Sequence, residues 1–261
     1  MDKNRLILIA GPCCVEDYET CDIVAGTVLK ICQDLGISYI FKSSIRKANR
    51  TKLDSFSGIG DDKALDILKR IKEKYSIPIL TDVHEVDDCI KYATIADYLQ
   101  VPAFLCRQTD LIASAAVHSK LGIAIKKGQF MSGSGMKYAM EKAKENTNTK
   151  IFLIERGNSF GYNDLVVDFT NIVTMKKFAN VIMDCTHATQ RPNQETGITG
   201  GNPEMIETLA LCAISSGADG LFIETHPNPH VSKSDGANML HLDKLKSILE
   251  KCIKVRNILT L

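Results

Sequence analysis

The sequence lacks tryptophan, long apolar runs and an excess of charge of either sign. No apolar stretch reaches the roughly 20 residues that a membrane-spanning helix needs. The segment Met1–Arg5 also lacks the apolar region of a signal peptide. The 32 basic and 31 acidic residues nearly cancel, so nothing global favours a nucleic acid or a membrane surface as partner. We therefore expect a cytoplasmic protein that binds neither.

A disulfide framework is absent as well. The nine cysteines are an odd number, and no regular spacing relates them. Cys32, Cys212 and Cys252 lie among apolar residues, where a small buried thiol is ordinary. We expect a reducing compartment and no structural disulfides.

No linker rich in proline, glycine or serine divides the chain, so we predict a single domain over residues 1–261. What the chain does contain is eight short apolar runs, separated by stretches long enough for a helix. The runs are Leu6–Ala10, Tyr39–Phe41, Ile77–Leu80, Tyr98–Val101, Gly122–Ile125, Ile151–Ile154, Val181–Met183 and Leu221–Ile223. This alternation is typical of repeated βα units. It predicts an α/β fold, the (β/α)8 TIM barrel, whose functional residues gather at the carboxyl ends of the strands.

Helices are expected between these runs. Their predicted ranges are Glu16–Leu35, Asp61–Tyr75, Val86–Thr94, Thr109–Lys120, Met136–Asn146, Asn171–Phe178, Pro203–Ser216 and Leu242–Val255. Three connections are longer than a simple turn requires, namely Ser43–Gly60, Gly157–Asp168 and Thr189–Asn202. All three follow predicted strands, so we expect them at the functional end of the barrel.

Potential metal ligands follow strands that become neighbours when the barrel closes. They are Cys13, His187, Glu224 and Asp235. This sulfur, nitrogen and oxygen set suits Zn²⁺, Fe²⁺, Mn²⁺ or Co²⁺ better than Mg²⁺ or Ca²⁺. Taken singly, each residue is as well explained by packing or solvation. His226 competes with His187, and Cys14 competes with Cys13, because each lies close to the site in sequence.

Basic residues also gather after the predicted strands. They are Lys42, Lys47, Arg50, Arg107, Lys126, Lys127 and Arg156. Lys126 and Arg156 directly continue apolar runs, and a cation in such a place needs an anion such as phosphate or carboxylate. The segment Lys47–Thr51 adds an amide and a hydroxyl to two cations, which suits a sugar phosphate. For Lys127 we expect a solvated side chain.

Two further readings of these residues stay open. Lys126 is also placed to form a Schiff base, although that chemistry would leave the four potential metal ligands without a shared purpose. Asp82 and His84 lie on one face of a predicted strand, where rim hydrogen bonds and a substrate contact are about equally supported.

Several segments together resemble the 3-deoxy-D-manno-octulosonate 8-phosphate synthase family. The matching segments run from residue 10 to residue 242, and they include Ala10–Cys13, Phe41–Ser44, Lys47–Arg50, Thr81–Glu85, Pro102–Asp110, Lys126–Phe130, Glu155–Gly157, Phe160–Asn163, Asp184–His187, Glu224–Pro227 and Ser234–Gly236. The stretches PAFLCRQTD and KKGQF are the most specific. The resemblance implies condensation of phosphoenolpyruvate with D-arabinose 5-phosphate and water in the biosynthesis of lipopolysaccharide.

The same resemblance assigns roles to residues. Cys13 places the chain with the metal-dependent kind, which implies His187, Glu224 and Asp235 as the other ligands. The implied substrate-binding residues are Lys42, Lys47, Asn49, Arg50, Thr51, Gln100, Arg107, Lys126 and Arg156. Lys47, Lys126 and Arg156 are expected to hold phosphoenolpyruvate, and the implied catalytic residues are Lys47, Asn49, His187 and Asp235. Arg107 is expected to reach the sugar phosphate of a neighbouring subunit, which implies a homotetramer.

The chain departs from the family pattern at several positions, which bear on kinetics and metal preference more than on reaction type, and two alternatives for the function remain open. Thr51, Asn158, the segment 132–135 and the loop 189–201 differ from what the family usually carries. One alternative is a related phosphoenolpyruvate-condensing synthase that uses another aldose. The other is a catalytically silent protein that binds a metal or a sugar phosphate on the same scaffold.

Overall fold

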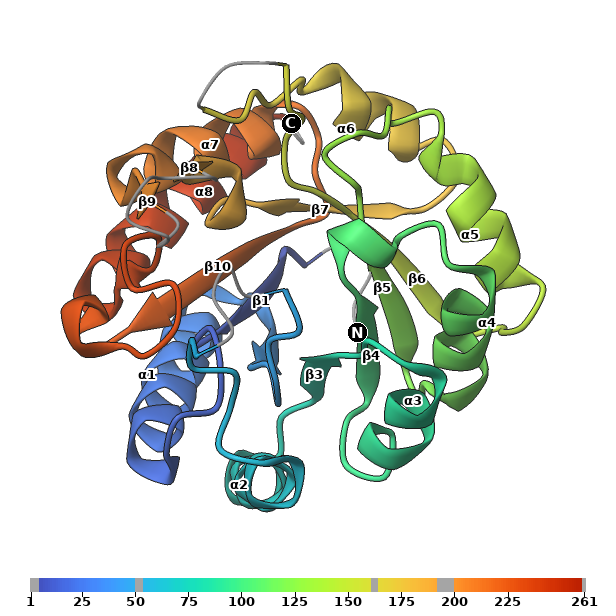
Figure 1. Ribbon diagram of the computed structural model, residues 1–261. Coiled ribbons are helices and arrows are strands. Elements are labelled where there is room, and N and C mark those ends of the chain that lie inside the picture. Colours follow the sequence, from blue (N-terminus) through green and yellow to red (C-terminus); the bar gives the residue numbers. More distant parts are fainter. Residues whose placement is uncertain (1–4, 50–53, 161–163, 192–199, 260–261) are drawn as a thin grey trace.

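Eight parallel strands form a closed ring at the centre of the molecule (Figure 1). The computed structural model describes residues 5–49, 54–160, 164–191 and 200–259. The ring consists of β1 (Ile7–Gly11), β2 (Ser38–Lys42), β3 (Ile79–Asp82), β4 (Tyr98–Val101), β5 (Gly122–Lys126), β6 (Lys150–Glu155), β7 (Asn180–Asp184) and β10 (Gly220–His226). β1 pairs with β2 on one side and with β10 on the other, which closes the ring. The predicted (β/α)8 barrel is confirmed.

Helices follow the strands and surround the ring (Figure 1). They are α1 (Tyr18–Leu35), α2 (Asp61–Tyr75), α3 (Val86–Tyr92), α4 (Thr109–His118), α5 (Met136–Lys144), α6 (Thr170–Met175), α7 (Ile206–Ser215) and α8 (Leu245–Leu259). The prediction for α2 was correct at both ends. α1 begins later than predicted because the side chain of Asp17 caps it, accepting a hydrogen bond from the amide of Thr20 at 2.7 Å.

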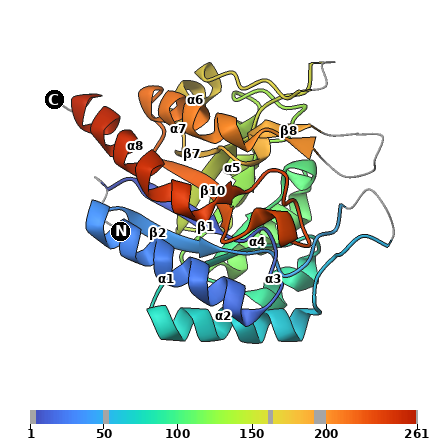
Figure 2. The same cartoon turned by 90° about the vertical axis from the view of Figure 1, so that its left-hand side faces the viewer.

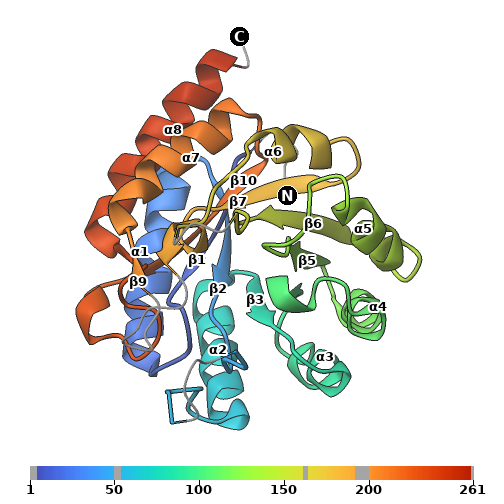
Figure 3. The same cartoon turned by 45° about the horizontal axis from the view of Figure 1, so that its top comes forward.

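Sequence reasoning missed the shortest elements. β8 (Gln190–Arg191) and β9 (Gly200–Gly201) form a two-stranded antiparallel pair, and β11 (Leu240–His241) adds to β10. Pro203–Met205 and Leu242–Lys244 are 3₁₀ turns that precede α7 and α8, whereas the predicted helices began at Pro203 and Leu242. In Figure 3, α7 and α8 lie side by side. None of the helices in the described part of the chain is long and apolar enough to span a membrane.

Successive residues of each strand face opposite sides of the ring, and each side has its own apolar core. The inner core fills the barrel with Ile7, Ile9, Ile40, Leu80, Tyr98, Ala124, Phe152, Ile154, Ile182 and Phe222. The outer core packs the alternate residues of each strand, such as Ile123 and Ile125 of β5, against the helices. Burial on both sides explains why the strands read as continuous apolar runs.

The two ends of the barrel differ in what lies there. Figure 2 shows both chain termini at one end of the molecule and β8 at the other. β8 lies in the connection that follows β7. The end of the molecule that carries β8 is therefore the end at which the barrel strands finish. The site described below lies at that end.

Candidate functional site

A layer of polar side chains lies directly on the inner core of the barrel. Each member of this layer follows an inner core residue by two positions along the chain, so its side chain also points into the barrel. They are Lys42, Asp82, Gln100, Lys126, Arg156, Asp184 and Glu224, and all are buried. The ring of Phe222 forms the floor of this layer, with its centroid 4.1 Å from Lys126 Nζ and 5.4 Å from Lys42 Nζ. Charges buried this completely in the barrel mark a site rather than a surface.

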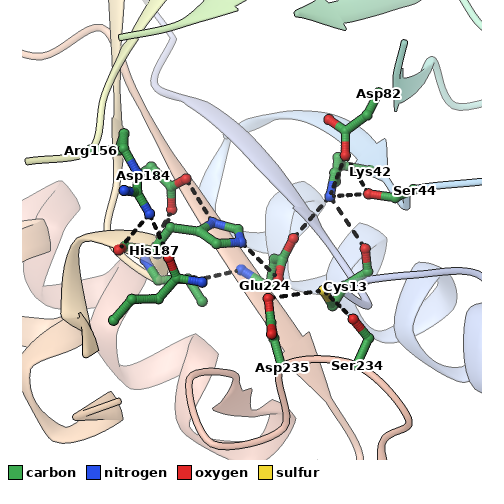
Figure 4. Close-up of polar contacts among 12 residues, drawn as sticks. Cys13, Lys42, Ser44, Asp82, Arg156, Asp184, His187, Glu224, Ser234 and Asp235 are labelled. Carbon is green, nitrogen blue, oxygen red and sulfur yellow. Dashed lines mark hydrogen bonds and ion pairs between the residues drawn. The ribbon is translucent and has the colours of Figure 1, made fainter. Parts of the chain in front are cut away.

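Lys42 connects one half of the layer (Figure 4). Its ammonium donates to Glu224 Oε1 and to Ser44 Oγ, each at 2.9 Å, and lies 3.6 Å from Asp82 Oδ2. Ser44 and Gln100 both donate hydrogen bonds to the Asp82 carboxylate. Burial disfavours the ionised form of Asp82, yet Lys42 and Lys47 hold the pKa of this carboxyl well below its usual range. Burial also opposes the charge of Lys42, whose pKa is nevertheless raised by Asp82 and Glu224.

Asp184 connects the other half. One of its oxygens, Oδ2, lies 2.7 Å from Lys126 Nζ and 2.8 Å from His187 Nδ1. The other accepts the backbone N–H of His187 at 2.9 Å, which fixes the start of the turn that carries this histidine. A carboxylate only accepts hydrogen bonds, so Nδ1 of His187 donates to Asp184. The other ring nitrogen, Nε2, faces Glu224 Oε2 at 3.4 Å.

Cys13 lies beside Asp235, which belongs to the loop after β10 (Figure 4). The Cys13 sulfur is 3.3 Å from Ser234 Oγ and 3.8 Å from Asp235 Oδ2. Asp235 has a φ of 49°, in the left-handed region that few residues other than glycine adopt. Burial, together with the charge of Glu224, raises the pKa of the Cys13 thiol well above its ordinary value. The thiol is therefore protonated at neutral pH unless a cation displaces its hydrogen.

These donors meet the chemical requirements of a borderline divalent ion. They lie as two pairs, Cys13 with Asp235 and His187 with Glu224, at separations of 3.8 and 3.4 Å that two ligands of one ion can span. Glu224 Oε2 is buried without a hydrogen-bond partner and lies opposite His187 Nε2, so one cation can take both atoms as ligands. Within the described ranges, no three His, Cys, Asp or Glu side chains are already grouped as a metal site. The residues fit an ion if the two pairs close around it.

Two further cations complete the site. Burial opposes charge on Lys47, but Cys13, Glu224 and Asp82 around it raise its pKa well above the ordinary value. The guanidinium of Arg156 donates to the carbonyl of His187 at 3.1 Å and to Gln190 Oε1 at 2.5 Å. Burial lowers the pKa of Arg156, which makes an anionic partner favourable there.

The residues expected to bind the sugar phosphate are not all in this layer. Asn49 is exposed on the loop after β2, and Arg50 and Thr51 lie outside the described residues. Arg107 is exposed after the 3₁₀ turn Ala103–Leu105. Gln100 is fully inside the layer, bound to Asp82.

The competing ligands lie differently from the ones that were preferred. The Cys14 sulfur faces the carbonyl of Ile45 at 4.0 Å, and Nδ1 of His226 accepts the backbone N–H of Asn228 at 3.0 Å. Asp82 belongs to the polar layer, whereas His84 stacks on Phe104 with their ring centroids 6.3 Å apart.

The expectation of a solvated Lys127 was wrong. Its side chain is fully buried and lies 3.3 Å from Glu155, which is equally buried. The reason is that the strand ladder continues past β5, with the amide of Lys127 donating to the carbonyl of Ile154 at 2.8 Å. Asp184, Glu155 and Ser234 were not singled out from the sequence. The signal available for Asp184 and Glu155 was their position directly after an apolar run.

Comparisons with known proteins identify the family of this chain. The model of the DAHP synthetase I family matches residues 2–260. A 2-dehydro-3-deoxyphosphooctonate aldolase of Fusobacterium nucleatum is 46% identical over 257 residues, which cover 98% of this chain and 92% of the relative. Proteins of the same name from Koribacter versatilis and Campylobacter jejuni are 43% and 42% identical, and each match covers 98% of this chain. The matches cover 93% and 98% of those two relatives.

Proposed function

The chain belongs to the DAHP synthetase I family, and we propose that the polar layer at the carboxyl ends of its strands is the active site. The enzyme condenses phosphoenolpyruvate with D-arabinose 5-phosphate and water. The products are 3-deoxy-D-manno-octulosonate 8-phosphate and inorganic phosphate, a step in the formation of the KDO sugar of lipopolysaccharide. The observation that carries the assignment of the site is the set of buried lysine and arginine side chains pointing inward above Phe222.

Both substrates are anions, so the first task of the site is to hold them together against their repulsion. We assign Lys47, Lys126 and Arg156 to the phosphate and carboxylate of phosphoenolpyruvate. We assign the sugar phosphate to Asn49, Arg50 and Thr51, together with Arg107 of a neighbouring subunit. Lys42 and Gln100 complete the binding set. Fixing the two reactants face to face supplies much of the rate enhancement that such a bimolecular step needs.

The bonds that change follow from the substrates. The C3 carbon of phosphoenolpyruvate attacks the aldehyde carbon of the sugar, and the aldehyde oxygen takes up a proton. A water molecule adds its oxygen to C2 and gives up a proton. The bond between C2 and the phosphate oxygen of the resulting hemiketal phosphate then breaks. The C2 hydroxyl gives its proton to the departing phosphate, which leaves inorganic phosphate and a ketone at C2. We propose that Lys47, Asn49, His187 and Asp235 face these reacting atoms, where they hold and transfer the two protons.

We further propose that Cys13, His187, Glu224 and Asp235 hold a divalent ion, either Zn²⁺, Fe²⁺, Mn²⁺ or Co²⁺. When bound, such an ion polarises the aldehyde or positions the water. The support is the donor chemistry, together with the Glu224 oxygen that accepts no hydrogen bond and lies opposite His187 Nε2. Because the Cys13 thiol is protonated in the absence of a metal, binding of the ion should release a proton.

We propose that the enzyme is a cytoplasmic homotetramer. Arg107 is exposed, as a residue that reaches into the site of another subunit must be in an isolated chain. All nine cysteines are free thiols, which suits a reducing compartment. Light scattering at several protein concentrations measures the assembly directly, and a stable monomer would contradict it.

One assay tests the site and its ion together. The protein is stripped of metal, given phosphoenolpyruvate and arabinose 5-phosphate, and followed by phosphate release as single divalent ions are added back. We expect release only after addition of a borderline ion, with one phosphate formed for each sugar acid. Other aldose phosphates serve as the substrate control, and a faster reaction with one of them would contradict the assigned acceptor. Binding of both substrates without release would indicate a silent binding protein.

A further inference from the structure

A second charged pair lies on the outer side of the barrel, directly behind the site. Lys126 and Arg156 point inward, so their chain neighbours Lys127 and Glu155 point outward. Lys127 Nζ lies 3.3 Å from Glu155 Oε1, and both side chains are completely buried. The pair therefore joins the end of β5 to the end of β6. At the same point, each of these two chain segments contributes a positively charged side chain to the inner layer.

Lys127 also ties together the loops that continue these strands. Its ammonium donates to Asn158 Oδ1 at 2.8 Å and to the carbonyls of Met131 and Gly157, each at 3.2 Å. The amide of Asn158 in turn donates to the carbonyl of Met131 at 2.7 Å. One buried cation thus holds the loop after β5 and the loop after β6 in fixed relation.

Glu155 fixes the backbone at Arg156 itself. Its Oε1 accepts the N–H groups of Arg156 at 3.0 Å and of Gly157 at 2.7 Å. Gly157 has a φ of 87°, a conformation that glycine adopts without strain. The chain therefore leaves the sheet right after Arg156, and the carboxylate of Glu155 holds it in that turn.

We infer that Lys127 and Glu155 are positioning residues, which hold Lys126 and Arg156 at the separation that phosphoenolpyruvate requires. Both side chains bind the backbone next to Arg156, and the charge of Glu155 also favours the charged form of Arg156. The pair therefore acts on the inner layer through the backbone and through this charge. The inference rests on the proposed function, because it takes Lys126 and Arg156 as the residues that hold phosphoenolpyruvate.

The pair is poorly suited to a purely stabilising role. Burial lowers the pKa of Lys127 even though Glu155 lies beside it, so its partners do not fully compensate the loss of water. Buried ion pairs of this kind can often be replaced by uncharged groups without loss of stability. Removing both charges should therefore weaken substrate binding without a matching loss of stability.

The test uses the double variant Lys127→Met/Glu155→Gln in the full-length protein. Both charges are lost, while the glutamine oxygen still accepts the N–H groups of Arg156 and Gly157. We expect the folded variant to bind phosphoenolpyruvate about 10- to 100-fold more weakly in calorimetry, since displacements near 1 Å have effects of this size. The KM for phosphoenolpyruvate should rise in parallel, while the KM for arabinose 5-phosphate should stay within about threefold.

Lys72→Met is the matched control. Lys72 pairs with Asp97 at 2.6 Å where β4 begins, at the other end of the barrel. This variant should unfold at a lower temperature and bind phosphoenolpyruvate as the wild type does. If the double variant also binds it with unchanged affinity, the pair does not position the site and the inference is wrong. If the wild-type protein itself fails to bind phosphoenolpyruvate, the proposed function fails, and the inference with it.

Discussion

The two ends of this barrel carry lysine–carboxylate pairs of similar length in very different surroundings. Where the strands finish, Lys126 lies 2.7 Å from Asp184, and their side chains are 8% and 0% exposed. Where the strands begin, Lys176 lies 3.1 Å from Asp219, and their side chains are 38% and 24% exposed. Distance alone does not distinguish the pairs. Burial distinguishes them. Removing a charge from water costs free energy, so a buried charged pair indicates a functional role rather than a stabilising one.

The partners of the carboxylates differ in the same way. Asp219 uses its second oxygen to accept the backbone N–H of Val181 at 2.8 Å, and Asp97 accepts the N–H of Ile79 at 3.0 Å. These carboxylates link neighbouring strands of the barrel where they begin. Asp184 instead connects a buried lysine with a histidine whose other ring nitrogen faces Glu224. The same residue types thus hold the fold together at one end and form the proposed active site at the other.

The largest loss of activity is expected when one lysine is removed from the buried end of the barrel. Lys126→Met should lower kcat/KM by about 1,000-fold, as does the loss of one preorganised donor in other active sites. Lys72→Met removes the same group from the other end and should leave kcat/KM within about twofold. Steady-state kinetics on both variants, with circular dichroism to check folding, decides the matter. Equal losses in the two variants would mean that burial does not mark the site.

Removing the sulfur tests the ion. Cys13→Ala should abolish retention of the divalent ion and reduce activity by at least about 100-fold, because a metal ligand is lost. Metal content after dialysis, measured by inductively coupled plasma mass spectrometry, is the direct readout. Cys185→Ala removes another buried thiol, one that donates to the carbonyl of Met183, and should retain the ion. A Cys13→Ala protein that keeps both ion and activity would refute the ligand assignment.

Asp184 should influence the ion without touching it. Asp184→Asn replaces the oxygen that holds His187 Nδ1 by a group that also donates, so the ring loses its fixed orientation. Outer partners of this kind change metal affinity by about 10- to 100-fold. Titration of the metal-stripped protein with Co²⁺ or Zn²⁺ measures that change. Unaltered affinity would place His187 outside the ligand set.

Much of the barrel could be predicted, because covering a parallel sheet on both sides makes each strand a continuous apolar run. The run Tyr98–Val101 and the helix Asp61–Tyr75 were predicted to the residue. The ends of other elements depend on single hydrogen bonds, such as the cap that Asp17 provides for α1. Two-residue strands such as β8 have no periodicity from which to predict them.

The site could be predicted in its residue types but not in its contacts. Position after a strand indicated Lys126 and Arg156 as anion-binding residues, and Cys13 and Asp235 as potential metal ligands. Lys127 was misjudged because the sequence does not show that the ladder extends one residue beyond β5. Asp184 was not predicted because its role is to join His187 to Lys126, and only the closed ring brings Lys126 of β5 within 3 Å of it.

Acid should affect the buried end of the barrel most strongly. The pKa values of Asp82, Asp184 and Glu224 are held low by nearby cations despite burial. A lowered carboxyl pKa adds stability above the unfolded-state value, about 4, and that contribution is lost as the pH falls through and below it. We expect the free energy of unfolding to drop by about 2 kcal/mol or more between pH 6 and pH 3.5. Urea titrations at the two pH values measure this drop, and a constant value would contradict the assigned charge states.

The smallest effect is expected at the end where the strands begin. Lys176 donates to Asp219 and to the carbonyl of Gly217 at 2.5 Å, yet more than a third of its side chain is exposed. Exposed pairs contribute little because water and salt screen them, so Lys176→Met should cost about 0.5–1 kcal/mol of stability. Its kcat/KM and metal content should equal those of the wild type. Added salt should reduce the difference in unfolding free energy between the two proteins, since the interaction is open to ions. A loss of activity in this variant would show that the exposed end also supports catalysis, and the division drawn between the two ends would then fail.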